Sequence, residues 1–248
     1  MLQDRHDAFG HEIYDYLNSS GGRGIVEICE RDDGYIDVSS GTEMYFSEYK
    51  DWPAFEKEAM EYARGRVLDI GGGAGRHSLY LQGKGLEVLA IDNSPLAIEV
   101  CKMRGLRNTR VISINQINST LGIFDTVLMM GNNFGLFGSF DGARRLLRRF
   151  SKITSENGRI IAQTNDVYKT DAPEHLDYHE FNRKRGRMAG QIRLKVRYKT
   201  YATPWFDYLM VSKEEMENIL DGTDWKVNVF VDSDGPVYTA IIDKKKLR

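Results

Sequence analysis

The sequence has little cysteine, no zinc-binding histidine motif and no long hydrophobic run. Of its 248 residues only Cys29 and Cys101 are cysteine, and no Cys-x-x-Cys pair occurs, so a disulfide scaffold and a four-ligand zinc site are excluded. The five histidines form no His-Glu-x-x-His motif, so we expect no metal site. No apolar run approaches the roughly 18 residues of a membrane span, and the first ten residues lack a signal-peptide pattern. We therefore expect a protein of the reducing cytoplasm with no membrane partner.

Charge of neither sign dominates. The 34 basic and 36 acidic residues leave a formal net charge of -2, which gives no overall attraction to nucleic acid or to an anionic membrane. Hydrophobic residues make up 41% of the chain and charged residues 28%, which is typical of a folded globular protein. At roughly 150 residues per domain, the length allows one or two domains.

From about residue 64 the sequence alternates between short apolar strands and helices. We expect strands at 67–70, 88–91, 110–114, 124–130 and 159–163, and helices after residue 76 and at 94–104, 141–151 and 212–220. Strands that are apolar almost throughout suit a parallel sheet covered on both faces. Two last strands, 226–231 and 237–243, flank a turn and are expected to pair antiparallel.

Two segments lie outside this alternation. Residues 1–62 are predicted to form a small cap made of a helix around 13–17, a hairpin over 25–38 and a second helix over 52–63. Residues 166–206 show no clean helical pattern, and we expect an extended insertion with a hairpin. The predicted organisation is thus a cap, 1–62, and a main domain, 63–248, whose insertion forms part of a substrate lid.

The strongest motif is Val67-Leu-Asp-Ile-Gly-Gly-Gly-Ala-Gly-Arg-His77. Glycines at 71, 73 and 75 allow a sharp turn from strand to helix and a close approach of a ligand to the backbone. A dinucleotide-binding fingerprint would require a third glycine at position 76, where this chain has Arg76. Asp92 ends the next apolar strand, where a carboxylate can accept both ribose hydroxyls of an adenosine.

With this loop, the acidic strand end and the closing strand pair, the sequence resembles the class I S-adenosylmethionine-dependent methyltransferases from about residue 65 to residue 243. The resemblance implies a Rossmann-like α/β fold with a seven-stranded, mostly parallel sheet in the order 3-2-1-4-5-7-6, whose last strand is antiparallel. It implies S-adenosylmethionine as the cofactor and S-adenosylhomocysteine as the product.

The resemblance also assigns cofactor-binding residues. Asp69 and the loop would hold the methionine moiety, Asp92 the ribose and Asn93 the adenine. The third-strand tip, acidic in the family, carries amides here, and the fourth-strand tip is where the methyl group meets its acceptor. The full expected set is Asp69, Gly71, Gly72, Gly73, Gly75, Arg76, Asp92, Asn93, Asn115, Gln116, Met130, Gly131 and Asn132.

The chemistry requires few side chains, because a sulfonium methyl group is already electrophilic. A base is needed only if the acceptor must lose a proton. His175 and His179 stand four residues apart in the insertion, but such a pair is more often incidental, and we assign no catalytic residue. For the substrate pocket we select Tyr45, Trp52, Asn133 and Trp205, because ligand sites are commonly apolar with a few polar groups.

A run of basic residues between 183 and 199 allows a different methyl acceptor, such as RNA. Arg193, Lys195, Arg197 and Lys199 alternate, so a strand would place them on one face. Such a hairpin is either a charged, aggregation-resistant edge or a surface for RNA or another anionic substrate. We predict methyl transfer to a small molecule. The alternatives are an RNA or protein methyltransferase, a nicotinamide-dependent oxidoreductase and a non-catalytic cofactor-binding module.

Overall fold

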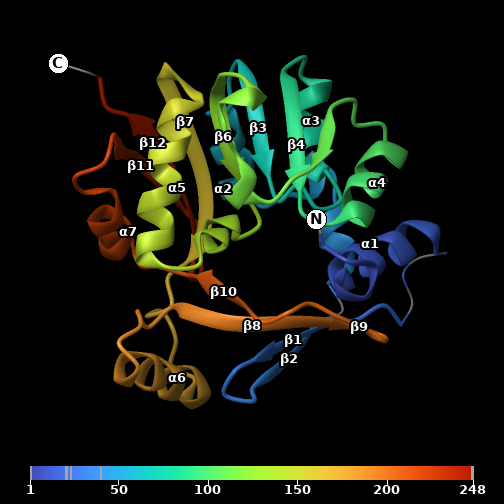
Figure 1. Ribbon diagram of the computed structural model, residues 1–248, viewed down its shortest axis with the longest axis vertical. Helices are drawn as coiled ribbons and strands as arrows, with labels where there is room; N and C mark the ends of the chain where they lie inside the picture. Colours follow the sequence, from blue (N-terminus) through green and yellow to red (C-terminus); the bar gives the residue numbers. More distant parts are fainter. Residues whose placement is uncertain (1, 20–21, 23, 40, 247–248) are drawn as a thin grey trace. The chain divides into compact units, whose positions relative to one another are not determined.

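The computed structural model describes residues 2–19, 22, 24–39 and 41–246 (Figure 1). The chain divides into two compact units. Unit 1 contains residues 1–52, 68–116 and 193–206, and unit 2 contains residues 53–67, 117–192 and 207–248. The expected boundary at residue 62, between a cap and a main domain, stays a prediction.

The larger sheet has seven strands in the order β11-β12-β7-β6-β3-β4-β5 (Figure 1). The strands are β3 (Arg66–Ile70), β4 (Glu87–Asp92), β5 (Thr109–Val111), β6 (Phe124–Met129), β7 (Thr154–Asn165), β11 (Trp225–Asp232) and β12 (Val237–Lys244). The pairs β4–β5 and β6–β7 are parallel, whereas β12 is antiparallel to both β7 and β11. The order and the antiparallel last strand confirm the predicted fold class.

The helices that alternate with these strands begin where the sequence provides caps. Helix α4 (Pro95–Met103) begins after Ser94, whose side chain accepts from the backbone of Ala97, and α5 (Phe140–Lys152) begins after Ser139 in the same way. Helix α7 (Lys213–Leu220) has the predicted capping box between Ser212 and Glu215. Helix α3 (Arg76–Gly83) follows the glycine loop directly.

A smaller sheet joins the N-terminal hairpin to the insertion. Strands β1 (Glu27–Arg31) and β2 (Ile36–Ser39) pair antiparallel, as predicted, and β1 also pairs with β8 (Gln191–Tyr198). The sheet order is β10-β8-β1-β2, with β9 (Tyr201–Ala202) on β8 and β10 (Phe206–Leu209) at one end. Segments more than 150 residues apart in the sequence, Ile28 and Arg197 for example, therefore lie opposite each other.

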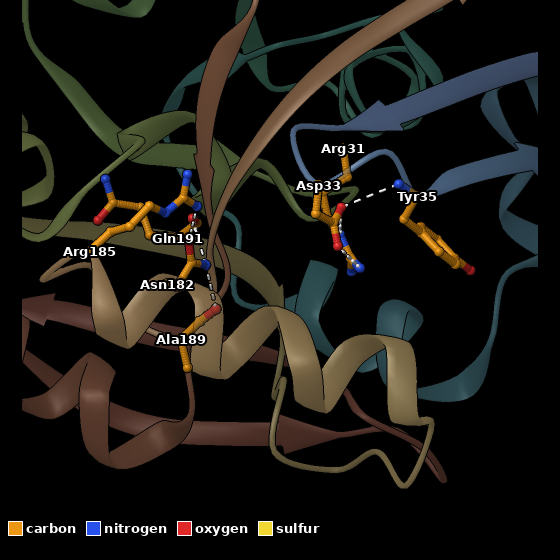
Figure 2. Close-up of polar contacts among 7 residues, drawn as sticks. All are labelled: Arg31, Asp33, Tyr35, Asn182, Arg185, Ala189 and Gln191. Atoms are coloured by element: carbon orange, nitrogen blue, oxygen red, sulfur yellow. Dashed lines mark hydrogen bonds and ion pairs between the residues drawn. The ribbon is translucent and has the colours of Figure 1, made fainter.

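The expectation that residues 166–206 contain no helix is wrong. Helix α6 spans Pro173–Lys184, with proline in its first turn. It buries only Tyr178, His179 and Asn182, so it lacks the wide apolar stripe that makes a helix visible in a sequence. Its end is held by Asn182, whose Nδ2 donates to the carbonyls of Ala189 (2.9 Å) and Gln191 (3.1 Å), as Figure 2 shows.

The turn of the β1–β2 hairpin is also held by side chains. Arg31 donates from Nε (2.8 Å) and Nη2 (2.7 Å) to the two carboxylate oxygens of Asp33 (Figure 2). Such a bidentate pair is both stronger and more directional than a single bond. The backbone N–H of Tyr35 donates to the same carboxylate over 3.3 Å. These bonds fix the turn that the sequence predicted at this place.

The remaining N-terminal elements are α1 (Ala8–Asn18), α2 (Ala54–Glu61) and the 3-10 turns η1 (Asp4–His6), η2 (Thr42–Phe46) and η3 (Tyr49–Asp51). Helix α1 packs against α4 through Ile13, which is fully buried with Ala97 and Val100. Helix α2 packs against β11 and β12 in unit 2. Within unit 1, α1 is thus part of the packing around the glycine loop.

Candidate cofactor-binding site

The loop between β3 and α3 carries the glycines that the sequence singled out. Gly71, Gly73 and Gly75 all have positive φ angles, of 71°, 53° and 78°. The backbone N–H groups of Gly71 and Gly72 donate to the carbonyl of Ile91 over 2.9 and 3.1 Å, which ties the loop to the end of β4. At Gly75 a side chain would be strained and would also lie 3.0 Å from the Cys101 sulfur. The glycines are therefore required by the backbone itself.

Asp92 stands at the end of β4 and is 9% exposed. Its Oδ2 accepts from the backbone N–H of Gly73 (3.1 Å) and its Oδ1 from that of Ser94 (2.9 Å). A carboxylate offers about four lone-pair sites, so roughly two stay available for a ligand's hydroxyl groups. Burial, the largest effect, and the charge of nearby Asp7 together raise the pKa of Asp92 to about 6, although these two bonds oppose the rise.

Asp69, near the end of β3, is 3% exposed and accepts a 2.6 Å bond from the hydroxyl of Ser78 on α3. Burial, the largest effect, and the charge of Asp92 raise its pKa to about 6, although the Ser78 bond opposes the rise. The carboxylate therefore links β3 to α3, which is a structural role. Its predicted role toward the cofactor stays a prediction.

Arg76 is the first residue of α3 and points toward the N-terminal turns. Its Nη1 donates to the hydroxyl of Ser47 over 2.8 Å, and its guanidinium lies 5.3 Å from the ring of Trp52. Trp52 is 3% exposed and packs against His77, with ring centroids 4.7 Å apart. The predictions that Arg76 binds the cofactor and that Trp52 lines a pocket remain open.

The N-terminal segment lies against the same strand ends, which the sequence did not reveal. The backbone N–H of Leu2 donates to the carbonyl of Asn93 over 3.0 Å, and Asp7 accepts from the backbone of Leu96 over 3.2 Å. The ring of Phe9 packs on Gly73. A methyl group added at Gly73 would lie only 3.4 Å from that ring. The one local feature of the sequence that marks this segment is Asp7, the N-cap of α1, whose carboxylate accepts from the backbone N–H of Gly10.

Asn115 and Gln116 lie in an exposed 3-10 turn, η4 (Ile114–Gln116), that follows β5. The side-chain oxygen of Gln116 accepts from the backbone of Ser113 over 3.0 Å. The two amides thus stand beyond the end of the third strand of the expected order, as the resemblance implied. Whether they contact adenine stays a prediction.

In unit 2, Met130, Gly131 and Asn132 follow β6, and Asn133 begins the 3-10 turn η6 (Asn133–Phe137). Asn132 has the uncommon φ of 63° for a residue other than glycine. Its backbone N–H donates to the side chain of Gln163 (3.0 Å) and its carbonyl accepts from the hydroxyl of Tyr208 (2.6 Å). Within the described chain its buried Oδ1 has no hydrogen-bond donor. Strained residues often mark functional positions.

The residues selected in the insertion have structural partners. His175 and His179 both lie on α6, and His179 is 6% exposed and packs edge-on against Tyr168. Trp205 is half-buried, with the ammonium of Lys195 4.3 Å from its ring. These contacts leave the roles of His175, His179 and Trp205 as predictions.

Two basic residues of the hairpin, Arg197 at the end of β8 and Lys199 just after it, form ion pairs within unit 1. Arg197 donates to Glu30 of β1 and Lys199 to Asp15 of α1, each over 2.6 Å. These charges hold the insertion hairpin to the N-terminal segment. Such pairing reduces the charge that the hairpin offers to an RNA phosphate.

Comparisons with known proteins show what the chain is similar to. Residues 67–158 match a family model described as a methyltransferase domain, a segment that includes the glycine loop, Asp92 and β6. This segment is similar to that domain over 92 of the 248 residues of the chain. No curated protein matches the sequence.

Solved structures extend the similarity to the whole chain. A S-adenosylmethionine-dependent methyltransferase from Bacteroides fragilis, solved in complex with S-adenosylhomocysteine, is 24% identical with a TM-score of 0.83, covering 99% of this chain and 98% of that chain. Methyltransferases from Methanosarcina mazei and Clostridium acetobutylicum are 16% and 15% identical, with TM-scores of 0.60 and 0.58. Each similarity covers 80% of this chain, and it covers 100% of the Methanosarcina chain and 93% of the Clostridium chain. The chain has the class I methyltransferase fold.

No helix among the described residues has the length and apolar character that crossing a bilayer demands. The same residues contain no group of three or more His, Cys, Asp or Glu side chains placed to hold a metal ion.

Proposed function

We propose that the protein transfers the methyl group of S-adenosylmethionine to a small-molecule acceptor by in-line displacement. The observation that carries this proposal is the bond between Asp92 and the Gly73 backbone. It fixes a buried carboxylate beside the glycine loop, with lone pairs left for two hydroxyl groups. That arrangement fits the ribose of an adenosine cofactor.

The other cofactor assignments follow from position. Asp69 and the loop residues Gly71, Gly72, Gly73 and Gly75 would hold the amino-acid part. Asn93, Asn115 and Gln116 would lie along the adenine, while Arg76, Met130, Gly131 and Asn132 complete the set that the resemblance implies.

The cofactor supplies an electrophilic methyl group on a sulfonium, so this chain's residues need only bind, orient and exclude water. Asp92 would orient the adenosine through the ribose. Phe9, which packs on Gly73, would keep water from the loop. No residue is assigned as a base, because the acceptor decides whether a proton must leave.

Two alternatives are less well supported. A nicotinamide cofactor places its pyrophosphate at the start of the helix after the loop, where this chain has Arg76 in place of glycine. An RNA acceptor would need a basic surface, whereas Arg197 and Lys199 already pair with acidic residues.

The test is transfer of label from methyl-tritiated S-adenosylmethionine in a cell extract separated into small-molecule, protein and RNA fractions. The proposal predicts enzyme-dependent label in the small-molecule fraction and formation of S-adenosylhomocysteine. Label confined to RNA or protein would refute the small-molecule acceptor and keep the methyltransferase. Absence of label, with cofactor bound, would favour a non-catalytic module. The Asp92→Ala variant is the control for enzyme-dependent label.

A further inference from the structure

Two glutamates of unit 1 face each other beneath the N-terminal segment. Glu12 of α1 is fully buried, at 0% exposure, and its Oε1 accepts a 2.7 Å bond from the hydroxyl of Thr42. Its other oxygen, Oε2, is also buried and has no hydrogen-bond donor among the described residues. Glu27 of β1 lies within hydrogen-bonding reach of Glu12 and is only half-buried. We call these two glutamates, together with the side chains that contact them, the acidic recess; Glu12 is its fully buried member.

The groups that act on these two carboxyls are neutral or acidic. Tyr45 and the thiol of Cys29 are hydrogen-bonding partners of Glu27, the thiol lying 3.5 Å from Oε1, and Asp37 is a nearby like charge. No cation of the described chain acts on either carboxyl. A buried carboxylate without a counter-charge is costly, and a second one beside it adds repulsion.

The pKa values of both glutamates are raised, as expected for buried carboxyls without a neighbouring cation. Burial, the largest effect, and the charge of the neighbouring Glu27 together raise the pKa of Glu12 to about 8. Burial likewise raises the pKa of Glu27 above its ordinary value. Without a ligand the two carboxyls must share a proton. A bound cation with N–H groups would replace that proton and satisfy Oε2.

The acidic recess is connected to the candidate cofactor site by two rings. Phe9 packs on Gly73, and its ring lies edge-on to that of Tyr45, with centroids 5.0 Å apart. Tyr45 in turn is a hydrogen-bonding partner of Glu27. A ligand bound at Glu27 therefore lies one pair of rings away from the glycine loop, in the same unit. Tyr45 is the residue that the sequence selected for the substrate pocket.

We propose that the acidic recess binds a protonated amine of the methyl acceptor, between the carboxylates of Glu12 and Glu27. An ammonium group has three donors and no acceptor, which suits two neighbouring carboxyls of which one oxygen, Oε2 of Glu12, has no donor among the described residues. A metal ion fits less well, since the described residues hold no group of three metal-ligating side chains. This inference rests on the proposed function and narrows its acceptor to ammonium-bearing molecules.

The experiment measures binding of matched pairs of ligands to the protein saturated with S-adenosylhomocysteine. Ethylamine, butylamine and 2-phenylethylamine are compared with ethanol, butanol and 2-phenylethanol by saturation-transfer NMR. We expect amines to bind and the alcohols of the same skeleton not to bind. Glu12→Gln and Glu27→Gln should each weaken amine binding at least tenfold. Glu43→Gln, an exposed change on η2, is the matched control and should change nothing.

Two further readings make the result unambiguous. Both glutamine variants should melt at or above the wild-type temperature, because they remove a buried titratable group, so lost binding cannot be attributed to unfolding. Equal binding of alcohols, retained amine binding in the variants, or no amine binding by protein that binds S-adenosylhomocysteine would each overturn the inference. Wild-type protein that fails to bind S-adenosylhomocysteine would instead overturn the proposed function.

Discussion

The backbone N–H of Gly73 donates to Oδ2 of Asp92 over 3.1 Å. This bond connects the glycine loop that follows β3 to the end of β4, two places that the sequence marks independently. A carboxylate held in this way has its orientation fixed before a ligand arrives. Preorganisation of this kind lowers the entropy cost of binding.

Asp92→Ala should weaken binding of S-adenosylhomocysteine at least tenfold, about 1.4 kcal/mol, because the ribose hydroxyls lose their acceptor. Calorimetric titration measures the effect. Asp234→Ala, in the exposed turn between β11 and β12, is the matched carboxylate control and should leave the dissociation constant unchanged. An unaltered constant in Asp92→Ala would remove Asp92 from the site.

Cofactor affinity should depend on pH, since the pKa values of both Asp92 and Asp69 are raised to about 6. The ionised carboxylate of Asp92 accepts two hydroxyl bonds, so protonation below pH 6 should weaken binding. Between pH 7.5 and pH 5 we expect the dissociation constant of S-adenosylhomocysteine to rise about tenfold. Asp92→Asn should flatten the curve. A slope retained in that variant would assign the titration to Asp69.

The same shifts predict how stability varies with pH. A folded-state pKa above the unfolded value of about 3.9 means that the folded state binds more protons between roughly pH 4 and pH 6. The contribution of Asp92 and Asp69 to stability therefore falls as pH rises through that window. Urea denaturation at pH 4.5 and 6.5 measures this contribution. Asp92→Asn and Asp69→Asn should each reduce the difference, and an unchanged difference would show that other groups cause it.

Gly75→Ala should destabilise the fold by about 1–2 kcal/mol from the left-handed backbone alone, with an added cost from contact with the Cys101 sulfur. Gly85→Ala is the matched control, because Gly85 also has a positive φ, of 86°, but a methyl group there would meet nothing within 4 Å. Chemical denaturation compares the two. Equal destabilisation would mean that the loop can move away from Cys101.

The role of the basic hairpin can be tested with Arg197→Gln and Lys199→Gln. Both residues pair with acids of the same unit, so we expect unchanged S-adenosylhomocysteine affinity and turnover and no RNA binding by the wild-type protein. Electrophoretic mobility shift with single-stranded and duplex RNA at several salt concentrations is the measurement. RNA binding that is lost in the variants would support the RNA alternative.

The sheet was predictable because its strands are short, apolar and separated by capped helices. The run 67–70, the acidic end at Asp92 and the capping box at Ser212 are local signals, and each lies where it was expected. Helix α6 was missed because only three of its residues are buried, so its sequence shows no apolar stripe.

The pairing of β1 with β8 could not be predicted for a different reason. It joins residues such as Glu30 and Lys195 that are far apart in the chain, and nothing local specifies such a partner. The acidic recess was missed for the same reason, because Glu12, Glu27 and Thr42 come from three elements. Asp7 and Phe9 became site candidates only when the structure placed them near the strand ends.

The most direct test of the account is calorimetric titration of the wild-type protein with S-adenosylmethionine, S-adenosylhomocysteine and NAD in parallel. The account predicts that the first two bind and that NAD does not. Binding of NAD alone would contradict it, because the glycine loop and Asp92 would then hold a dinucleotide and the oxidoreductase alternative would replace methyl transfer.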